Sequence, residues 1–155
     1  MSVKSLIVFS LSVPMLFITG CMSTGARPES FIQGQASGWK SIELNDIAIG
    51  NYDVAWQKTV DTIARNYDIE MMDKESGYLR TGWTYGISGG ALDRYRGRLT
   101  VKYPDVRTPK IVEIKTEAQW LSYNYGSWQS GWDQSFQRDI YTALSGRLGR
   151  TVSNN

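Results

Sequence analysis

Two stretches in the second half of the chain alternate strictly between apolar and polar residues. Residues 95–103 place Tyr95, Leu99 and Val101 opposite a polar row, and residues 110–120 repeat the pattern. Because successive side chains of a strand point to opposite faces of a sheet, this alternation predicts two strands that are each buried on one face. Residues 104–109 begin and end with proline and predict the turn between them. Other elements must then cover the apolar face.

Two stripes of large apolar residues at helical spacing can supply that cover. The first stripe comprises Tyr52, Trp56, Val60, Ile63 and Tyr67, and the second comprises Trp132, Phe136, Ile140, Leu144 and Leu148. Asn51 is the expected N-cap of the first helix. Ser130 and Asp133 form a predicted capping box for the second helix. Trp56 and Trp132 are therefore predicted to lie in the core.

The remaining patterns predict three further strands, at the start of residues 40–49 and over 68–72 and 78–85. In residues 78–85 the alternation sets Leu79, Thr81, Trp83 and Tyr85 on one face. The expected fold is α+β, with an antiparallel sheet of about four to five strands gripped by two amphipathic helices. We assign it to residues 39–149 and expect residues 150–155 to be a disordered tail.

The predicted sheet also has a charged face, opposite the apolar one. Antiparallel pairing of the two long strands would set Arg96, Arg98 and Lys102 against Glu113 and Glu117. Such cross-strand pairs contribute about 0.2–1 kcal/mol each and support the register of a sheet. A balanced sheet face is therefore the favoured interpretation, ahead of an anion site.

Composition removes most familiar enzyme chemistry. The chain of 155 residues contains no histidine and one cysteine, which excludes Ser-His-Asp and Cys-His catalysis, histidine-containing zinc sites and internal disulfides. We therefore predict no catalytic residue, no cofactor and no metal site. A formal net charge of +2 gives no indication of nucleic-acid binding. Paired carboxylates are the remaining enzymatic alternative, with Asp68, Glu70 and Asp93 as candidates.

The N-terminus is typical of an exported protein. Lys4 precedes an apolar run over residues 6–18, and small residues follow it. A basic start, an apolar segment of roughly 7–15 residues and small residues at its end describe a signal peptide. A transmembrane helix is the alternative, but it needs about 20 apolar residues, and Pro14 lies within the run. Residues 1–20 are thus predicted to be a signal peptide that is removed.

The last three residues of this segment and the one after it, Ile18, Thr19, Gly20 and Cys21, resemble the lipobox of bacterial lipoproteins. The resemblance implies cleavage before Cys21 and acylation of that cysteine, which would anchor the chain in a membrane. By the sorting rule of such proteins, Met22 implies the outer membrane. A free thiol is the alternative. Residues 21–38 are predicted to comprise the lipidated cysteine and a flexible tether, with an exposed apolar pair at Phe31 and Ile32.

Three short motifs in the first half of the predicted domain resemble the BamC family, which comprises lipoprotein subunits of the outer-membrane β-barrel assembly machinery. They are residues 51–56, 67–70 and 73–78, which read NYDVAW, YDIE and DKESGY. The resemblance implies a helix-grip fold, an envelope protein partner and no enzymatic activity. This chain departs from that family in having one domain and a short tether, instead of two domains and a long N-terminal segment.

An uncharged aromatic segment over residues 121–131 joins the last predicted strand to the second helix. With its flanks it forms a candidate binding platform, comprising Trp120, Tyr123, Tyr125, Trp128 and Trp132. The alternative is that these rings fasten the helix to the sheet. The sequence as a whole predicts a lipid-anchored outer-membrane lipoprotein that faces the periplasm and acts as an accessory or scaffold subunit. A binding module for a glycan, lipid or peptide is the second hypothesis.

Overall fold

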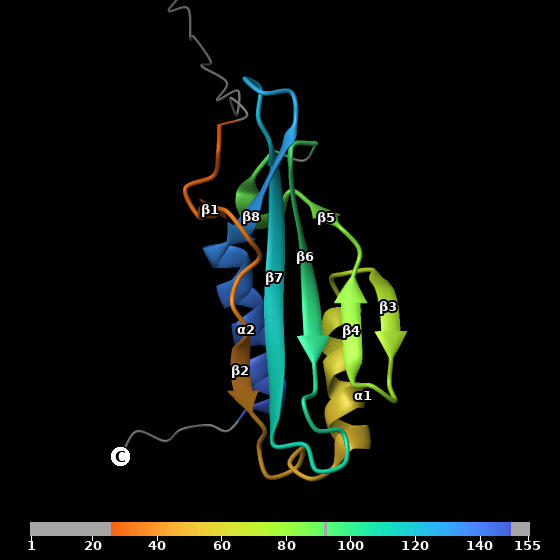
Figure 1. Cartoon of the computed structure of the whole chain (residues 1–155). Coiled ribbons are helices and arrows are strands. Elements are labelled where there is room, and N and C mark those ends of the chain that lie inside the picture. The colour runs from red at the N-terminus through yellow and green to blue at the C-terminus, as the bar shows by residue number, and fades with distance from the viewer. Residues whose placement is uncertain (1–25, 92, 150–155) are drawn as a thin grey trace, which may run out of the picture.

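A computed structural model describes residues 26–91 and 93–149. These residues form one antiparallel sheet with two α-helices on one of its faces (Figure 1). The strands are β1 (Phe31–Gln33), β2 (Lys40–Glu43), β3 (Ile69–Asp73), β4 (Tyr78–Thr81), β5 (Thr84–Tyr85), β6 (Tyr95–Lys102), β7 (Ile111–Leu121) and β8 (Trp128–Asp133). The helices are α1 (Tyr52–Ile63), α2 (Gln134–Leu148) and a short 3-10 turn, η1 (Ile87–Gly89).

The two long strands β6 and β7 form the centre of the sheet. The main strand order is β1-β8-β7-β6-β4-β3, while β2 pairs with β7 and β5 with β6. Leu99 lies opposite Thr116 and Val101 opposite Ile114, so the apolar positions of both strands share one face. This pairing and its buried face confirm the prediction from alternation.

Both helices cover that buried face. The side chain of Asn51 accepts a hydrogen bond from the Val54 N–H and caps α1, as predicted. Trp56 of α1 is buried, and Thr59 makes a 2.6 Å hydrogen bond to the Tyr103 hydroxyl beyond the end of β6. The α2 side chains in contact with the sheet are buried and comprise Phe136, Ile140, Leu144 and Leu148. Burial of these large side chains supplies the main favourable contribution to folding.

The predicted fold class is wrong. The structure is mostly an eight-stranded antiparallel sheet with only two α-helices in its described residues, one of them short, and not an α+β helix-grip with four to five strands. One reason is that residues 78–85 form two strands, because the chain breaks at Gly82 and Trp83 between β4 and β5. Glycine within a strand pattern often marks such an interruption.

The other two unexpected strands, β1 and β8, pair with each other at one edge of the sheet. Phe31–Gln33, which the sequence assigns to the tether, pairs with β8 as β1. Phe31 is buried, while Ile32 is exposed, so the expectation of an exposed pair holds for only one of the two residues. Trp132 belongs to β8 instead of α2, because Asp133 caps the helix and α2 begins at Gln134. The predictions of a core Trp132 and of a capping box starting at Ser130 are therefore wrong.

Candidate functional site

The sheet face opposite the helices carries a group of aromatic rings around one arginine. Arg96 of β6 lies with its guanidinium carbon 4.1 Å from the ring centre of Trp128 in β8 and 4.7 Å from that of Trp83. Tyr85 of β5 lies 5.7 Å away and also packs edge-on against Trp128. A guanidinium within about 6 Å of an aromatic face is attracted by the ring quadrupole.

Hydrogen bonds fix the same guanidinium at the surface of the sheet. Nε and Nη2 of Arg96 donate to the Gln119 side-chain oxygen at 3.0 and 2.7 Å, and Nη1 donates to the Tyr85 hydroxyl at 2.9 Å. We call Trp83, Tyr85, Arg96, Gln119 and Trp128 the Arg96 cluster. Trp83 and Tyr85 come from one segment, and folding of the sheet brings them to Arg96, Gln119 and Trp128 on three other strands.

Charge distinguishes Arg96 from the next arginine on the same face. Arg98 lies opposite Glu117 and forms an ion pair with it at 2.6 Å. Arg96 lies opposite the neutral Gln119, and among residues 26–91 and 93–149 no carboxylate lies within ion-pair distance of it. The prediction of a balanced charged face thus holds at Arg98, whereas the positive charge of Arg96 has no direct acidic partner within these residues.

The structure divides the five residues of the predicted aromatic platform between three places. Trp120 lies on the helix-covered side of β7 and packs against the core. Trp128 and Trp132 lie on the opposite face of β8, and Trp128 joins the Arg96 cluster. Tyr123 and Tyr125 extend from the turn between β7 and β8 and are exposed. The five rings therefore do not form one surface.

Sequence reasoning missed two members of the Arg96 cluster, Trp83 and Tyr85. The alternation over residues 78–85 sets them on the same face as Leu79 and Thr81, which are fully buried. The break at Gly82 instead directs Trp83 and Tyr85 toward Arg96 on the other face. Gly82 is the signal that could have identified this change of face.

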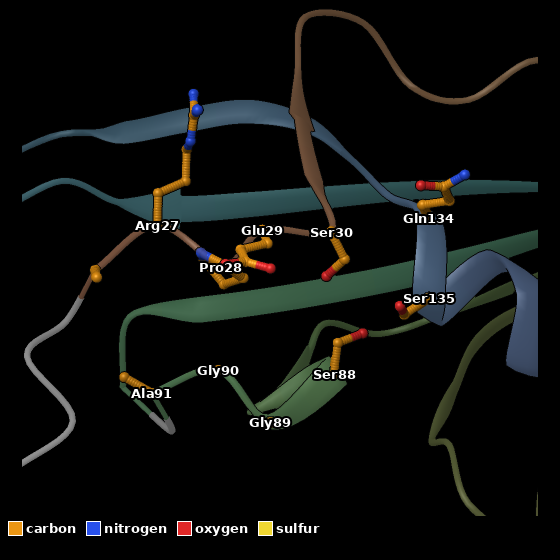
Figure 2. Close-up of a pocket in the computed structure, with 11 residues that line it drawn as sticks. Arg27, Pro28, Glu29, Ser30, Ser88, Gly89, Gly90, Ala91, Gln134 and Ser135 are labelled. Carbon is orange, nitrogen blue, oxygen red and sulfur yellow. The ribbon is translucent and has the colours of Figure 1, made fainter. Parts of the chain in front are cut away.

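A pocket lies at one end of the sheet, and Figure 2 shows the residues that line it. The pocket has a volume of about 790 Å³ and lies between the segment before β1, the η1 loop and the start of α2. Ser30 and Ser88 lie at its wall, and both of their hydroxyls donate to the buried carboxylate of Asp133, at 2.5 and 2.6 Å. Ser88 adopts a left-handed backbone conformation with φ of 52°.

The carboxylate of Asp133 accepts four hydrogen bonds, and the residue has no exposed surface. Besides the two serines, it accepts from the Tyr95 hydroxyl at 2.5 Å and from the Phe136 N–H at 2.6 Å. Burial by itself raises the pKa of this carboxyl, but the four hydrogen bonds outweigh it and hold the pKa below its usual range. A carboxylate stabilised in this way is a weak base, so this junction is suited to fixing β1, η1, β6 and α2 together.

Of the three candidate carboxylates of the enzymatic alternative, two lie together at the start of β3 and the third lies in a separate loop. Asp68 and Glu70 are exposed at β3, where Glu70 pairs with Arg80 at 3.2 Å. Asp93 lies in the loop before β6, with a carboxylate oxygen 3.9 Å from Arg94. These contacts are surface ion pairs, and they do not define a shared acid–base centre.

The part of the chain that the structure describes contains no group of three or more acidic or cysteine side chains placed to hold a metal ion. None of its helices has the length and apolar character needed to cross a membrane. The signal peptide, the lipobox residues Ile18, Thr19, Gly20 and Cys21, and the predicted tail lie outside the described residues.

Comparisons with models of known protein families and with curated proteins find no match to this chain.

Proposed function

We propose that this protein is a lipid-anchored lipoprotein of the outer membrane. Its folded domain faces the periplasm and acts as a non-enzymatic accessory or scaffold subunit of an envelope protein complex. The lipobox over residues 18–21 and the chain's single cysteine support the anchor. Two or more acyl chains hold a protein stably on a bilayer, so the domain would remain at the membrane without a spanning helix.

The observation that carries the binding role is the Arg96 cluster on the sheet face opposite the helices. Trp, Tyr and Arg are the residue types that contribute most binding energy at protein interfaces. Here they lie side by side on the sheet, with Trp83 between β4 and β5 and the other members on strands, and Tyr85 is 47% exposed. The guanidinium of Arg96 is already oriented by Gln119, so little side-chain entropy would be lost on binding. A protein partner with an acidic or carbonyl-rich surface fits this arrangement.

Site-specific photocrosslinking in cells tests this proposal. A photoreactive amino acid replaces Tyr85 in the full-length lipoprotein, and a matched control replaces Thr142 on the exposed side of α2. We expect a discrete adduct with one envelope protein from position 85, a weaker adduct when Arg96→Gln is added, and none from position 142. Equal adducts from both positions, or none from position 85, would contradict the proposal. Recovery of a glycan or lipid adduct would instead support the second hypothesis.

The anchor is tested separately by metabolic labelling with an alkyne fatty acid. We expect the wild-type chain to incorporate the label and float with outer-membrane fragments. The Cys21→Ser variant should lose both properties. Labelling that persists in this variant would show that the lipid is attached elsewhere.

A further inference from the structure

The turn between β7 and β8, residues 122–127, presents two tyrosines to solvent. Tyr125 is 74% exposed and Tyr123 is 61% exposed. No residue of this turn carries a charge. Tyrosine combines an apolar ring with a polar hydroxyl, which suits the boundary between water and an apolar phase.

The turn is held in a defined shape. The Gly126 N–H donates to the Ser122 carbonyl oxygen at 3.0 Å, and Gly126 has a φ of +59°, which favours glycine. The guanidinium of Arg94 lies 3.4 Å from the ring centre of Tyr123. The neighbouring Asp93 forms an ion pair with Arg94 and partly balances its charge. The surface around the two tyrosines is therefore aromatic and nearly neutral.

The start of the described chain lies at the same end of the molecule as this turn. Figure 1 shows the segment before β1, the η1 loop and the β7–β8 turn together at one end, with the β6–β7 turn at the other. Ser30 is tied to Asp133, and β1 is paired with β8, so the chain is fixed to the domain from this point on.

Chain length limits how far this end can lie from the lipid. Ala26, the first described residue, follows Cys21 by five positions. A fully extended chain of that length spans at most about 18 Å. The end that carries Tyr123 and Tyr125 must then stay within reach of the bilayer surface, whereas the β6–β7 turn lies at the distant end of the domain.

We propose that the turn over residues 122–127, which we call the tyrosine turn, contacts the headgroup region of the membrane and orients the domain on it. This inference rests on the proposed lipid anchor at Cys21. Aromatic side chains of this kind concentrate at membrane–water interfaces. In this orientation β6 and β7 extend away from the bilayer, and the Arg96 cluster lies toward the membrane-proximal end. Because the turn is uncharged, the contact depends little on salt or on anionic lipid.

Spin labelling of the acylated full-length protein in vesicles tests this orientation. Asn124→Cys places a nitroxide in the turn while it keeps both tyrosines, and Cys21 cannot react because its sulfur forms the thioether. Arg107→Cys in the β6–β7 turn is the control. In phosphatidylethanolamine–phosphatidylglycerol vesicles, we expect a several-fold lower collision rate with a water-soluble nickel chelate at position 124 than at position 107. Collisions with oxygen should change in the opposite sense.

Replacing both tyrosines provides the second variant. Tyr123→Ser together with Tyr125→Ser should raise the nickel collision rate at position 124 toward that at position 107, with the fold unchanged by circular dichroism. Equal nickel accessibility at both positions in vesicles that carry the floating, acylated protein would overturn the membrane contact and leave the anchor intact. Failure of the protein to float with vesicles would refute the anchor, and the inference with it.

Discussion

The two faces of the central sheet carry side chains with different roles. On the helix-covered face Tyr95, Leu99 and Val101 are fully buried, and a buried carboxylate there, that of Asp133, has four donors. On the opposite face Arg96 and Arg98 stay partly exposed and stack on aromatic rings. The first face determines stability, because its groups lose all contact with water. The second face is ordered yet accessible, which is what a binding surface requires.

The largest effect is expected from removing the buried junction on the covered face. Asp133→Ala leaves the hydroxyls of Ser30, Ser88 and Tyr95 without their acceptor and removes the N-cap of α2. Losing a buried, charge-assisted network and a cap should lower the free energy of unfolding by about 3–5 kcal/mol in urea titrations. Asp53→Ala breaks an exposed pair with Lys74 and removes an acidic residue from the first turn of α1, which are small effects, and it serves as the control. Comparable losses in both variants would contradict the special role of Asp133.

The same carboxylate should make stability depend on acid. Its pKa in the folded state lies below the value of about 3.9 for an unfolded aspartate. Its contribution is therefore complete above about pH 3.9 and is lost as the pH falls through the lower folded pKa. The difference in unfolding free energy between wild type and Asp133→Asn should be constant at neutral pH and shrink in acid. A difference that grows below about pH 4 would mean that the pKa of Asp133 is higher in the folded state than in the unfolded state, which would contradict this prediction.

Two glycines offer a matched pair for the next effect. A Cβ at Gly131 would collide with the backbone oxygen of Ile32 and lie 2.8 Å from the Phe31 ring, so Gly131→Ala must push β1 away from β8. Such overpacking costs about 1–3 kcal/mol. Gly146 lies within α2, and a methyl group added there would meet no atom within 4 Å, so Gly146→Ala should instead stabilise by about 0.5–1 kcal/mol. Thermal unfolding of both variants tests whether the two substitutions change stability in opposite directions. Destabilisation by both would contradict the prediction.

These contrasts also explain how far the sequence predicts the fold. Strict alternation identified β6 and β7, and the apolar stripes identified α1 and most of α2. Each of these elements buries one face, so its apolar residues recur at one regular spacing along the sequence. Strand β1 escaped prediction because its three residues carry no period and are held by pairing with β8. Strand β8 escaped because Trp132 also fits the spacing of the α2 stripe.

The candidate site could be predicted only in part, for a related reason. The sequence placed Arg96 on the polar face of its strand, and the register confirms this. Its aromatic neighbours depend on the change of register after Gly82, which is fixed only when β5 pairs with β6, and on the long-range pairing of β7 with β8. A one-residue change of register moves every following side chain to the other face, so local alternation could not place Trp83 and Tyr85.

A smaller effect on stability is expected at the sheet face opposite the helices. Arg96→Gln removes the stacking on Trp83 and Trp128 and the bonds to Gln119, all of which lie at a partly exposed surface. Partly exposed stacking of this kind contributes about 0.5–1 kcal/mol. We expect a loss near this range in urea titrations, together with a shift in tryptophan emission. Arg96→Lys keeps the charge without the planar group and should lose nearly as much stability. A loss of unfolding free energy from Arg96→Gln as large as that from Asp133→Ala would contradict the prediction and place Arg96 in the core.

The smallest effect is expected from the ion pair beside this cluster. Glu117 accepts two hydrogen bonds from Arg98, at 3.0 and 2.6 Å, and both side chains remain partly exposed. Such pairs contribute about 0.2–1 kcal/mol and weaken with salt. Glu117→Gln should therefore lower the free energy of unfolding by no more than about 1 kcal/mol at low salt, and by less at high salt, as measured by urea titration. The loss from Arg96→Gln should change little with salt, because ring stacking and neutral acceptors hold that guanidinium. Equal salt dependence in the two variants would show that Arg96 also relies on a carboxylate, and the distinction between the two arginines would fail.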